Sequence, residues 1–567
     1  MEGSILKIEN LSVSYTHEQV LAVRDFTLAI KPGESVGLIG ESGSGKSSLA
    51  LAIMGLLQNR AEVHGRVWFK DIELTGLMEQ ELNDYRWSRI AIVFQNSLDV
   101  LNPVMTVGEQ IGEVLRRHRG IKGMAARERM EELLSMVGLE PYWLKSYPHQ
   151  LSGGMRQKVL IAMAFSCEPE VLLVDEPTMA IDAIAKDEIV KLLLRLKEEK
   201  RCSLLVISHE LPVISAMTSR MLVMYSGNIV EEGETKEVLN NPLHPYTRGL
   251  IYASPSINPY RDMWGIPGEH GPIGSKQCSF FSRCNQSIDR CAQENPPLQL
   301  VCKGRRVACS RGGIVTLLRG KAIDKSYMVK ERRIVACSSC DIEVKMGEVT
   351  ALVGQSGSGK TTIAEILAGI IKADAGEVVF ENKEVCGNKE TSRTGGIQIV
   401  FQDPLSSTNE SFTVEEIVRE PLDIIRWYTK NEREQSVRDA LKNVQLPYDN
   451  IFLKRHGFTL SGGQRQRVAI ARALVMKPKL LIADEISAML DPSTTANLLR
   501  LLKGLQVREG FAMLYISHDL ALVQKIADKI YVMCNGRIIE HGSIGDVLRC
   551  PKEEYTKILL RSASINT

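Results

Sequence analysis

The stretch GESGSGKSS, Gly40–Ser48, decides the fold of the chain around it. Its glycines, Gly40, Gly43 and Gly45, let the backbone wrap closely with its N–H groups pointing inward, which suits a phosphate group. The short apolar run SVGLIG leads into it, and the apolar helical stretch SSLALAIMGLL continues from it. A phosphate-binding loop requires this strand–loop–helix context, so the stretch predicts a nucleotide site in an α/β domain. For a motif of this kind standing alone, a chance Gly-rich turn is the alternative.

The same loop occurs a second time as GQSGSGKTT, Gly354–Thr362. Further motifs follow both loops in one order: VFQ, LSGG, an apolar run ending in Asp-Glu, and SH. Repeated order at a nearly constant spacing indicates two copies of one domain, which removes the chance reading of the loop. Three pairs are each separated by 309 residues: Ser152 and Ser461, Asp175 and Asp484, and His209 and His518.

Length and composition limit the class of protein. A chain of 567 residues is too long for one ordinary core, and 44% apolar with 24% charged residues is typical of globular proteins. With 70 Lys and Arg against 68 Asp and Glu, the formal net charge of +2 gives no bulk electrostatic reason to expect nucleic acid as a partner. No apolar run approaches the roughly 18 residues that span a bilayer, and the start lacks a signal-peptide pattern. We therefore expect a cytoplasmic chain that acts on a membrane only through partners, with thiols or metal ligands rather than disulfides among its cysteines.

Within each loop, the side chains that follow the last glycine predict how a triphosphate is held. Lys46 and Lys360 are placed to reach the terminal phosphates, and Ser47 and Thr361 to offer a hydroxyl to Mg²⁺. The predicted nucleotide contacts of the two loops are Gly40, Ser42, Gly43, Gly45, Lys46, Ser47 and Ser48, and Gly354, Ser356, Gly357, Gly359, Lys360, Thr361 and Thr362.

Paired carboxylates predict the hydrolytic chemistry. Asp175 and Asp484 each end an apolar strand, which suits a carboxylate that holds Mg²⁺ through water. Glu176 and Glu485 follow directly and point the other way, so they are candidates to orient the attacking water. A buried pair of acids kept for structure is the alternative. Because both copies keep the glutamate, we expect an ATPase with two hydrolytic sites.

Taken together, the loop, LSGG, VDEPT and SH elements resemble the nucleotide-binding domains of ABC-type ATPases over nearly the whole chain. The resemblance implies an α/β fold of two tandem P-loop domains, each with a helical signature subdomain, packed head to tail. It implies that the signature of one half caps ATP held by the other. It also implies sensor glutamines that reach Mg²⁺, histidines at the γ-phosphate and tyrosines on adenine, although packing is the alternative for a lone Tyr or His. The residues so assigned are Ser152, Gly153, Gly154, Ser461, Gly462 and Gly463 in the signatures, Gln95 and Gln402, His209 and His518, and Tyr15 and Tyr327.

Two departures from the family pattern concern communication between the sites. Ile486 follows Glu485 where the first half has Pro177, the residue usual in the family. The segments MAID, 179–182, and AMLD, 488–491, differ from the usual SALD. We expect the two sites to communicate unequally.

The flanks of the two halves narrow the kind of ABC protein. NNPLHPYTRGLIYASP, Asn240–Pro255, resembles the segment that follows the ATPase core in peptide/nickel importers, and CPKEEYTKILLRS, Cys550–Ser562, is a weaker echo. The chain resembles the two ATPase subunits of such an importer fused in one chain. The resemblance implies two transmembrane permease subunits, an extracytoplasmic solute-binding protein and a place at the cytoplasmic face of the membrane. Rival interpretations are a ribosome-recycling-like or a metalloenzyme-activating soluble twin ATPase.

Five cysteines lie between the two halves, in residues 276–310. The importer resemblance implies four of them as ligands of a 4Fe–4S cluster, with Cys302 able to compete for the fourth place. Gaps of 5, 6 and 17 residues are wider than zinc-finger pairs, but zinc and uncomplexed thiols stay open, as do a structural and a redox role. The predicted domains are 1–265, the Cys-rich lobe 266–312, and 313–567. The predicted cluster ligands are Cys278, Cys284, Cys291 and Cys309.

Overall fold

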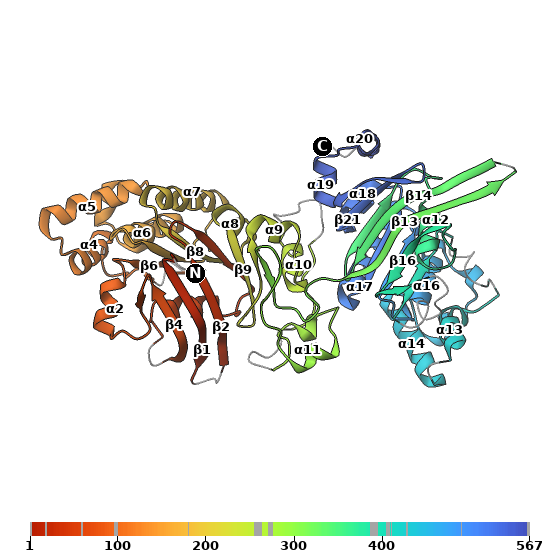
Figure 1. Ribbon diagram of the computed structural model, residues 1–567, viewed down its shortest axis with the longest axis horizontal. Helices are drawn as coiled ribbons and strands as arrows, with labels where there is room; N and C mark the ends of the chain where they lie inside the picture. The colour runs from red at the N-terminus through yellow and green to blue at the C-terminus, as the bar shows by residue number, and fades with distance from the viewer. Residues whose placement is uncertain are drawn as a thin grey trace. The chain divides into compact units, whose positions relative to one another are not determined.

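The computed structural model describes residues 3–16, 20–57, 60–95, 100–179, 181–254, 263–269, 276–330, 332–385, 395–403, 409, 411–426, 429–488 and 490–563. The chain forms two compact units, Met1–Ile257 with Gly268–Gly313, and Asn258–Pro267 with Ile314–Thr567 (Figure 1). Residues 268–313, called the Cys-rich segment below, therefore pack with the first unit. The domain boundaries drawn from the sequence stay a prediction.

The first unit contains an antiparallel sheet of four strands in the order β2-β1-β4-β5. Buried and exposed residues largely alternate along β1, as expected for a strand with one face on a core. The buried face packs against Leu49 and Ile53 of α1, Lys46–Ile53. The strands are β1 Leu6–Tyr15, β2 Val20–Ile30, β4 Ala61–Phe69 and β5 Ile72–Glu73.

The second sheet of this unit has eight strands in the order β11-β12-β10-β9-β3-β8-β7-β6. The strands from β9 to β6 run parallel and are almost entirely buried, which explains their continuous apolar runs. The carboxyl ends of β3, β7 and β8 meet at one edge, where ligands of such sheets bind. The strands are β3 Ser35–Ile39, β6 Ile90–Val93, β7 Val171–Asp175, β8 Ser203–Ser208, β9 Arg220–Tyr225, β10 Asn228–Glu234, β11 Gln299–Cys302 and β12 Arg305–Val307.

The Cys-rich segment is joined to this sheet through β12, which pairs antiparallel with β10 at Glu231↔Val307. Arg305 of β12 forms an ion pair with Glu231, and both side chains are almost completely buried. A buried pair of this kind fixes the position of a segment even where its net stabilisation is small. The Cys-rich segment is therefore held firmly on the first unit.

The helices of the first unit cover the parallel sheet and form a separate layer around α4, α5 and α6 (Figure 1). Thr106 caps α4 by accepting from the Glu109 N–H while Glu109 reaches back, a capping box readable from the sequence. The helices are α2 Glu79–Tyr85, α4 Val107–Arg119, α5 Gly123–Met136, α6 Gly153–Phe165, α7 Ala183–Lys200, α8 Leu211–Met217, α9 Thr235–Asn240, α10 Pro245–Tyr252 and α11 Asp289–Gln293, with short 3₁₀ turns η1 Pro141–Lys145, η2 Pro148–Gln150 and η3 Phe281–Arg283.

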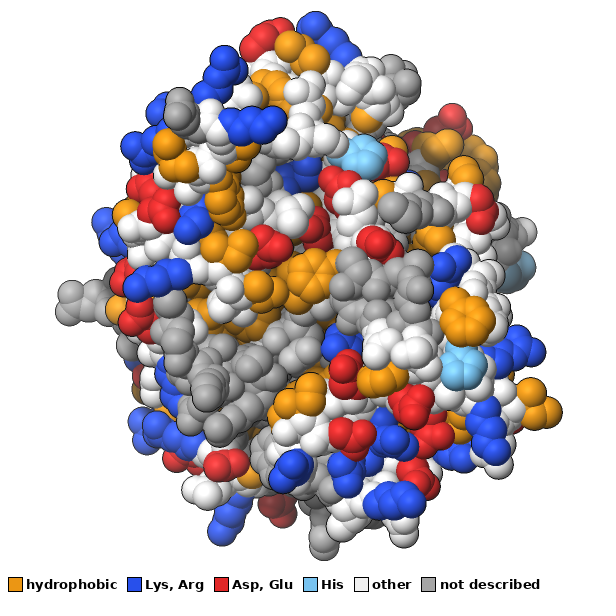
Figure 2. All heavy atoms as spheres, turned by 90° about the vertical axis from the view of Figure 1, so that its right-hand side faces the viewer, with side chains coloured by type: hydrophobic (Ala, Val, Ile, Leu, Met, Phe, Trp, Pro, Cys, Tyr) orange, Lys and Arg blue, Asp and Glu red, His pale blue; other side chains and the backbone are white. Residues whose placement is uncertain are grey.

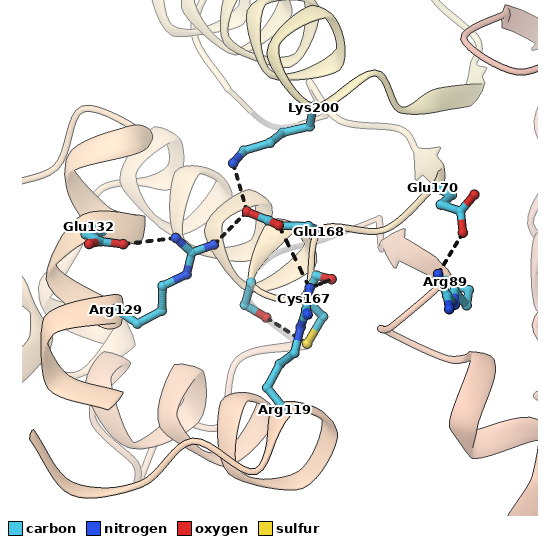
Figure 3. A network of polar contacts seen from close by, with 9 residues as sticks. Arg89, Arg119, Arg129, Glu132, Cys167, Glu168, Glu170 and Lys200 are labelled. Carbon is cyan, nitrogen blue, oxygen red and sulfur yellow. Dashed lines mark hydrogen bonds and ion pairs between the residues drawn. The ribbon is translucent and has the colours of Figure 1, made fainter. Parts of the chain in front are cut away.

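A polar network attaches this helical layer to the rest of the unit (Figure 3). Glu168, in the turn from α6 to β7, accepts from Arg129 of α5 at 3.0 Å and from Lys200 at the end of α7 at 2.9 Å. Arg119, at the end of α4, donates to the carbonyl oxygen of Cys167. The hydrogen bond from Lys200 is the main reason that the pKa of Glu168 lies below its ordinary value.

The second unit repeats this architecture in its own two sheets, ordered β14-β13-β16-β17 and β18-β19-β20-β15-β21-β22. Its strands are β13 Thr316–Val329, β14 Arg332–Lys345, β15 Val349–Val353, β16 Ala375–Phe380, β17 Lys383–Glu384, β18 Ile397–Val400, β19 Leu480–Asp484, β20 Ala512–Ser517, β21 Lys529–Cys534 and β22 Arg537–Ser543. Its helices are α12 Lys360–Leu367, α13 Val414–Ile425, α14 Lys430–Asn443, α15 Asn450–Leu453, α16 Gly462–Leu474, α17 Pro492–Glu509, α18 Leu520–Ile526, α19 Ile544–Arg549 and α20 Glu554–Ser562, with η5 Gly457–Thr459.

The predicted fold class, two tandem α/β domains each with a helical layer, is confirmed. Figure 2 shows Lys and Arg side chains interspersed with Asp and Glu over one face of the molecule, in keeping with a formal net charge of +2. Among the described residues, no helix has both the length and the apolar character needed to cross a bilayer.

Candidate functional site

The first phosphate loop connects β3 to α1 and has the backbone conformation that its glycines predict. Gly43 and Gly45 lie at φ +80° and +103°, in the region that favours glycine. A Cβ at Gly45 would lie 2.1 Å from the carbonyl oxygen of Ala22, whereas a Cβ at Gly43 would meet nothing within 4 Å. The loop is therefore closed against strand β2 on one side and open at Gly43.

Lys46 is buried in this loop, 7% exposed. Its ammonium donates to the carbonyl oxygens of Gly40 and Glu41, both at 2.9 Å, and to Ser44 Oγ at 3.3 Å. Burial lowers the pKa of Lys46, and the nearby Glu176 and Asp175 oppose that shift. Neutral acceptors bind an ammonium more weakly than phosphate oxygens do, so Lys46 can exchange them for a nucleotide.

Asp175 ends β7 beside this loop and is 4% exposed. Burial raises the pKa of its carboxyl group, and a hydrogen bond with Ser47 opposes the shift. Its Oδ1 is buried and has no hydrogen-bond partner within the described residues. Since an unpaired buried carboxylate oxygen is costly, the Asp175–Ser47 pair fits a hard cation that takes oxygen ligands, such as Mg²⁺.

Glu176 follows at φ 49°, a strained conformation for a residue other than glycine. Its N–H donates to the Ile207 carbonyl at 2.9 Å, so the strain is held by strand β8. Oε1 lies 2.8 Å from His209 Nδ1, and Oε2 accepts from Ser208 Oγ at 3.2 Å. The carboxylate is thus fixed between β7 and β8, and His209 is in contact with it.

The second loop repeats these features closely. Lys360 donates to the carbonyl oxygens of Gly354 and Gln355, both at 2.9 Å. Asp484 has a pKa raised by burial, opposed by a hydrogen bond with Thr361, and its Oδ1 also lacks a partner. Glu485, at φ 47°, lies 3.5 Å from both His518 and Lys360, so its contact with histidine is longer than in the first unit.

The signature serines begin helices in both units. Ser152 caps α6, because its Oγ accepts from the backbone N–H of Met155 at 3.3 Å. Ser461 caps α16 in the same way, with its Oγ accepting from the backbone N–H of Gln464 at 3.3 Å. Both serines are exposed. Gly153, Gly154, Gly462 and Gly463 form the first turns of these helices. The expectation that each signature meets the loop of the other unit stays a prediction.

The remaining predicted contacts have local partners. Tyr15 Oη lies 3.0 Å from Ser48 Oγ, while the Tyr327 ring faces Lys325 Nζ at 5.7 Å from its centroid. Gln95 lies with its amide nitrogen 2.8 Å from Met179 Sδ, and Gln402 is exposed. Contact of these four residues with adenine or Mg²⁺ stays a prediction.

The segments 179–182 and 488–491, which differ from the family's usual SALD, each end in an aspartate that caps the following helix. Asp182 accepts from the N–H groups of Ile184 and Ala185 and caps α7, and Asp491 caps α17 in the same way. Ile486, in place of proline, is buried in the core of the second unit.

Two cysteines of the Cys-rich segment have raised pKa values to which neighbouring cysteines contribute. Burial raises the pKa of Cys278 to about 11 and that of Cys284 to about 12, and in each case Cys291 and Cys309 add to the shift. Cys302 is exposed on β11. In the described part of the chain, no three His, Cys, Asp or Glu side chains are placed to hold a single metal ion. Four cysteine thiolates are the usual donor set of an iron–sulfur cluster, and their assignment to such a cluster in this chain stays a prediction.

Two tyrosines that were not predicted from the sequence hold the phosphate loops. Tyr246 of α10 accepts from the Glu41 N–H at 2.9 Å, and Tyr555 of α20 accepts from the Gln355 N–H at 3.1 Å. The two tyrosines are 309 residues apart, the spacing of the other paired motifs, and this was the signal in the sequence.

Comparisons with known proteins show what this chain is similar to. The family model described as "ABC transporter" matches residues 23–179 and 337–488, more than half of the chain, and "Oligopeptide/dipeptide transporter, C-terminal region" matches 230–291. The oligopeptide transport ATP-binding protein OppD of Mycobacterium bovis is 34% identical over 600 residues, covering 98% of both chains. The glutathione import ATP-binding protein GsiA of Salmonella typhimurium is 35% identical over 579 residues, covering 99% of this chain and 90% of that one. Among solved structures, the ATP-binding cassette MJ0796 bound to ADP and Pi matches 40% of this chain and 99% of its own at 29% identity, with a TM-score of 0.37.

Proposed function

Because this chain belongs to the ABC transporter family of ATPases, we propose that it is the ATP-hydrolysing subunit of an importer for peptides or a related small solute. The observation that carries the proposal is the repeated site: each unit joins a phosphate loop to a buried Asp and a clamped Glu. Relatives named for oligopeptide and glutathione import favour a peptide over the other predicted solute, nickel. The match of 230–291 to the oligopeptide/dipeptide C-terminal region supports the same choice.

Each loop binds the triphosphate through its backbone N–H groups and the start of the following helix. Lys46 and Lys360 neutralise the terminal phosphates. Ser47 with Asp175, and Thr361 with Asp484, would hold Mg²⁺, which supplies charge neutralisation at the phosphate oxygens when bound. The unpaired Oδ1 of each aspartate supports this assignment.

Hydrolysis is in-line attack of water on the terminal phosphate. Glu176 and Glu485 orient that water and accept its proton, and His209 and His518 hold these carboxylates while reaching toward the phosphate. The 2.8 Å contact of Glu176 with His209 and the 3.5 Å contact of Glu485 with His518 support a shared mechanism in the two units.

Two composite sites form when the units close on each other. Ser152, Gly153 and Gly154 cap ATP on the second loop, and their counterparts at 461–463 cap ATP on the first. Exposed serines at helix starts suit this role, because an N-terminal helix end attracts a phosphate.

Two permease subunits convert closure into transport, and a solute-binding protein delivers the cargo, which places this chain at the cytoplasmic face of the membrane. A cavity of about 380 Å³ in the first unit supports a docking position for a permease. Its lining includes Trp87, Val100, Asn102 and Met105, the last three shortly after Gln95 in the sequence. Gln95, a predicted nucleotide contact, thus precedes part of the proposed docking surface in the same stretch of chain.

The Cys-rich segment carries a 4Fe–4S cluster on Cys278, Cys284, Cys291 and Cys309. The contribution of Cys291 and Cys309 to the raised pKa values of Cys278 and Cys284 supports the assignment, and the exposure of Cys302 favours Cys309 as the fourth ligand. The cluster staples a segment that has little core of its own.

The proposal is tested by affinity purification of the chain from detergent-solubilised membranes under anaerobic conditions, with partners identified by mass spectrometry. Two multi-span proteins recovered in comparable amounts would support the importer. Recovery from the soluble fraction with ribosomes or a metalloenzyme would instead support the soluble twin ATPase, which relatives named for import do not favour.

A further inference from the structure

An ion pair joins the Cys-rich segment to the first phosphate loop. Arg283, at the end of η3 and next to Cys284, points its guanidinium at Glu41, the second residue of the loop. Nη1 lies 3.0 Å from Oε2 and Nη2 lies 3.5 Å from Oε1, a two-pronged arrangement. The Arg283 side chain is 5% exposed and that of Glu41 is 23% exposed, so solvent screens the pair only in part.

Aromatic rings hold the guanidinium in place. It lies 5.7 Å from the ring centroid of Tyr225 and 6.0 Å from that of Phe280, within the range of cation–π attraction. Tyr225 ends β9 beside the loop, and Phe280 belongs to the Cys-rich segment and packs on Tyr246. Arg283 therefore keeps its position only while the Cys-rich segment is folded against the first unit.

Glu41 puts a negative charge where a triphosphate binds. Its N–H is held by Tyr246 and its carbonyl oxygen accepts from Lys46 at 2.9 Å, so the residue is part of the loop itself. Its negative charge partly opposes the lowering of the pKa of Lys46, the phosphate-binding residue, by burial. The carboxylate of Glu41 repels a polyanionic nucleotide, and the positive charge of the Arg283 guanidinium reduces this repulsion.

The second loop has no such charge. Gln355 stands where Glu41 stands, its N–H is held by Tyr555 as that of Glu41 is held by Tyr246, and its lysine is bound in the same way. The two loops thus share their geometry and differ in charge at one position, Glu41 against Gln355, and in the first unit that position is paired with the Cys-rich segment.

From this difference we infer that Arg283 couples the folding state of the Cys-rich segment to ATP affinity at the first site and not at the second. With the segment in place, the charge of Glu41 is compensated and the first loop binds MgATP. When the segment loosens, Glu41 loses its ion pair with Arg283, and its carboxylate then repels the nucleotide more strongly. The inference rests on the proposed function only in that the first loop binds ATP. Linkage makes the coupling reciprocal, so bound nucleotide also stabilises the segment.

The test measures binding of a fluorescent ATP analogue, mant-ATP with Mg²⁺, to the full chain carrying Lys360→Ala, in which only the first loop binds. Arg283→Ala should weaken binding about five- to tenfold, a usual size for coupling between sites. Glu41→Gln, which gives the first loop the residue of the second, should restore the affinity of the Arg283→Ala chain to within about twofold of the starting chain. In the matched Lys46→Ala background, Arg283→Ala should leave binding at the second loop unchanged.

A second pair of variants addresses the segment itself. Cys278→Ser with Cys291→Ser should loosen it and weaken mant-ATP binding at the first loop, again with rescue by Glu41→Gln. Cys302→Ser, exposed on β11, is the control and should have no effect.

Several results would overturn the inference. If Arg283→Ala weakens binding equally with Glu41 and with Gln at position 41, Arg283 acts by some route other than this charge. If it weakens the second loop as much as the first, the effect is a general loss of structure. Absence of mant-ATP binding by the unmodified Lys360→Ala chain would refute the proposed function itself, and with it the premise of the coupling.

Discussion

Gly45→Ala tests whether the phosphate loop has the closed conformation described, with Gly43→Ala as its matched control. Both glycines have positive φ, so alanine at either position carries the strain of a left-handed conformation, about 1–2 kcal/mol. Only at Gly45 would the new Cβ also meet a backbone atom, the Ala22 carbonyl oxygen at 2.1 Å. A normal contact of this kind is about 3.3 Å or more, so strand or loop must move by roughly 1 Å.

The size of the affinity loss is set by the contact between the new Cβ and the Ala22 carbonyl oxygen, because the strain of positive φ is common to both variants. Forcing extra atoms into a packed region costs about 1–3 kcal/mol more. A loop that must leave its binding conformation loses affinity in proportion to the population of that conformation. Because about 1.4 kcal/mol is a factor of ten, Gly45→Ala should bind ATP about 5- to 150-fold more weakly than Gly43→Ala.

The assay is mant-ATP titration in the Lys360→Ala background, with circular dichroism to confirm that both variants are folded. Gly359→Ala and Gly357→Ala, read in the Lys46→Ala background, should repeat the contrast in the second unit, where the Cβ at Gly359 would lie 2.0 Å from the Ala336 carbonyl. Equal affinities of the two first-unit variants would refute the closed loop.

Further outcomes follow from the acids and the cysteines. Glu176→Gln and Glu485→Gln should each lower ATP turnover at their own site at least about 100-fold while leaving MgATP affinity within about twofold. Turnover is measured by phosphate release, for Glu176→Gln in the Lys360→Ala background and for Glu485→Gln in the Lys46→Ala background. An equal loss of affinity would contradict a role in water activation. Burial raises the pKa of Asp175 in the folded state. At a pH between the ordinary Asp pKa and this raised pKa, the unfolded chain has released a proton that the folded chain keeps. The free energy of unfolding of the nucleotide-free chain therefore falls as pH rises between these two values. Asp175→Asn should flatten this slope and, without Mg²⁺, raise the melting midpoint by about 1–3 °C in scanning calorimetry; an unchanged slope would contradict the assignment. Iron and sulfide analysis of anaerobically purified chain should show the cluster retained in Cys302→Ser and lost in Cys309→Ser, and the reverse would exchange the two ligands.

Much of this fold was predictable because the same motifs occur in the same order in both halves of the sequence. The glycines of GESGSGKSS fix a loop by sterics alone, and buried parallel strands appear as unbroken apolar runs such as Val171–Asp175. Asp175 and Asp484 could be chosen because a carboxylate at a strand end beside such a loop has few other uses.

The contacts missed in the sequence are those between distant segments. Nothing local to Arg283 indicates a partner 242 residues away, and Glu41 occupies a loop position that the motif leaves free. Tyr246 could have been found from its 309-residue spacing to Tyr555, whereas the pairing of β12 with β10 depends on how the Cys-rich segment folds back. Tertiary packing, and not propensity, decides such contacts.

The measurement that tests the central claim most directly is uptake of a radiolabelled peptide by cells whose copy of this chain is replaced by the Glu176→Gln, Glu485→Gln double variant. If ATP hydrolysis at these two sites drives import, as proposed, uptake should fall to the level of cells without the chain, while the amount of the variant in the membrane fraction stays unchanged. Uptake at the normal rate in cells that carry the double variant would contradict the account.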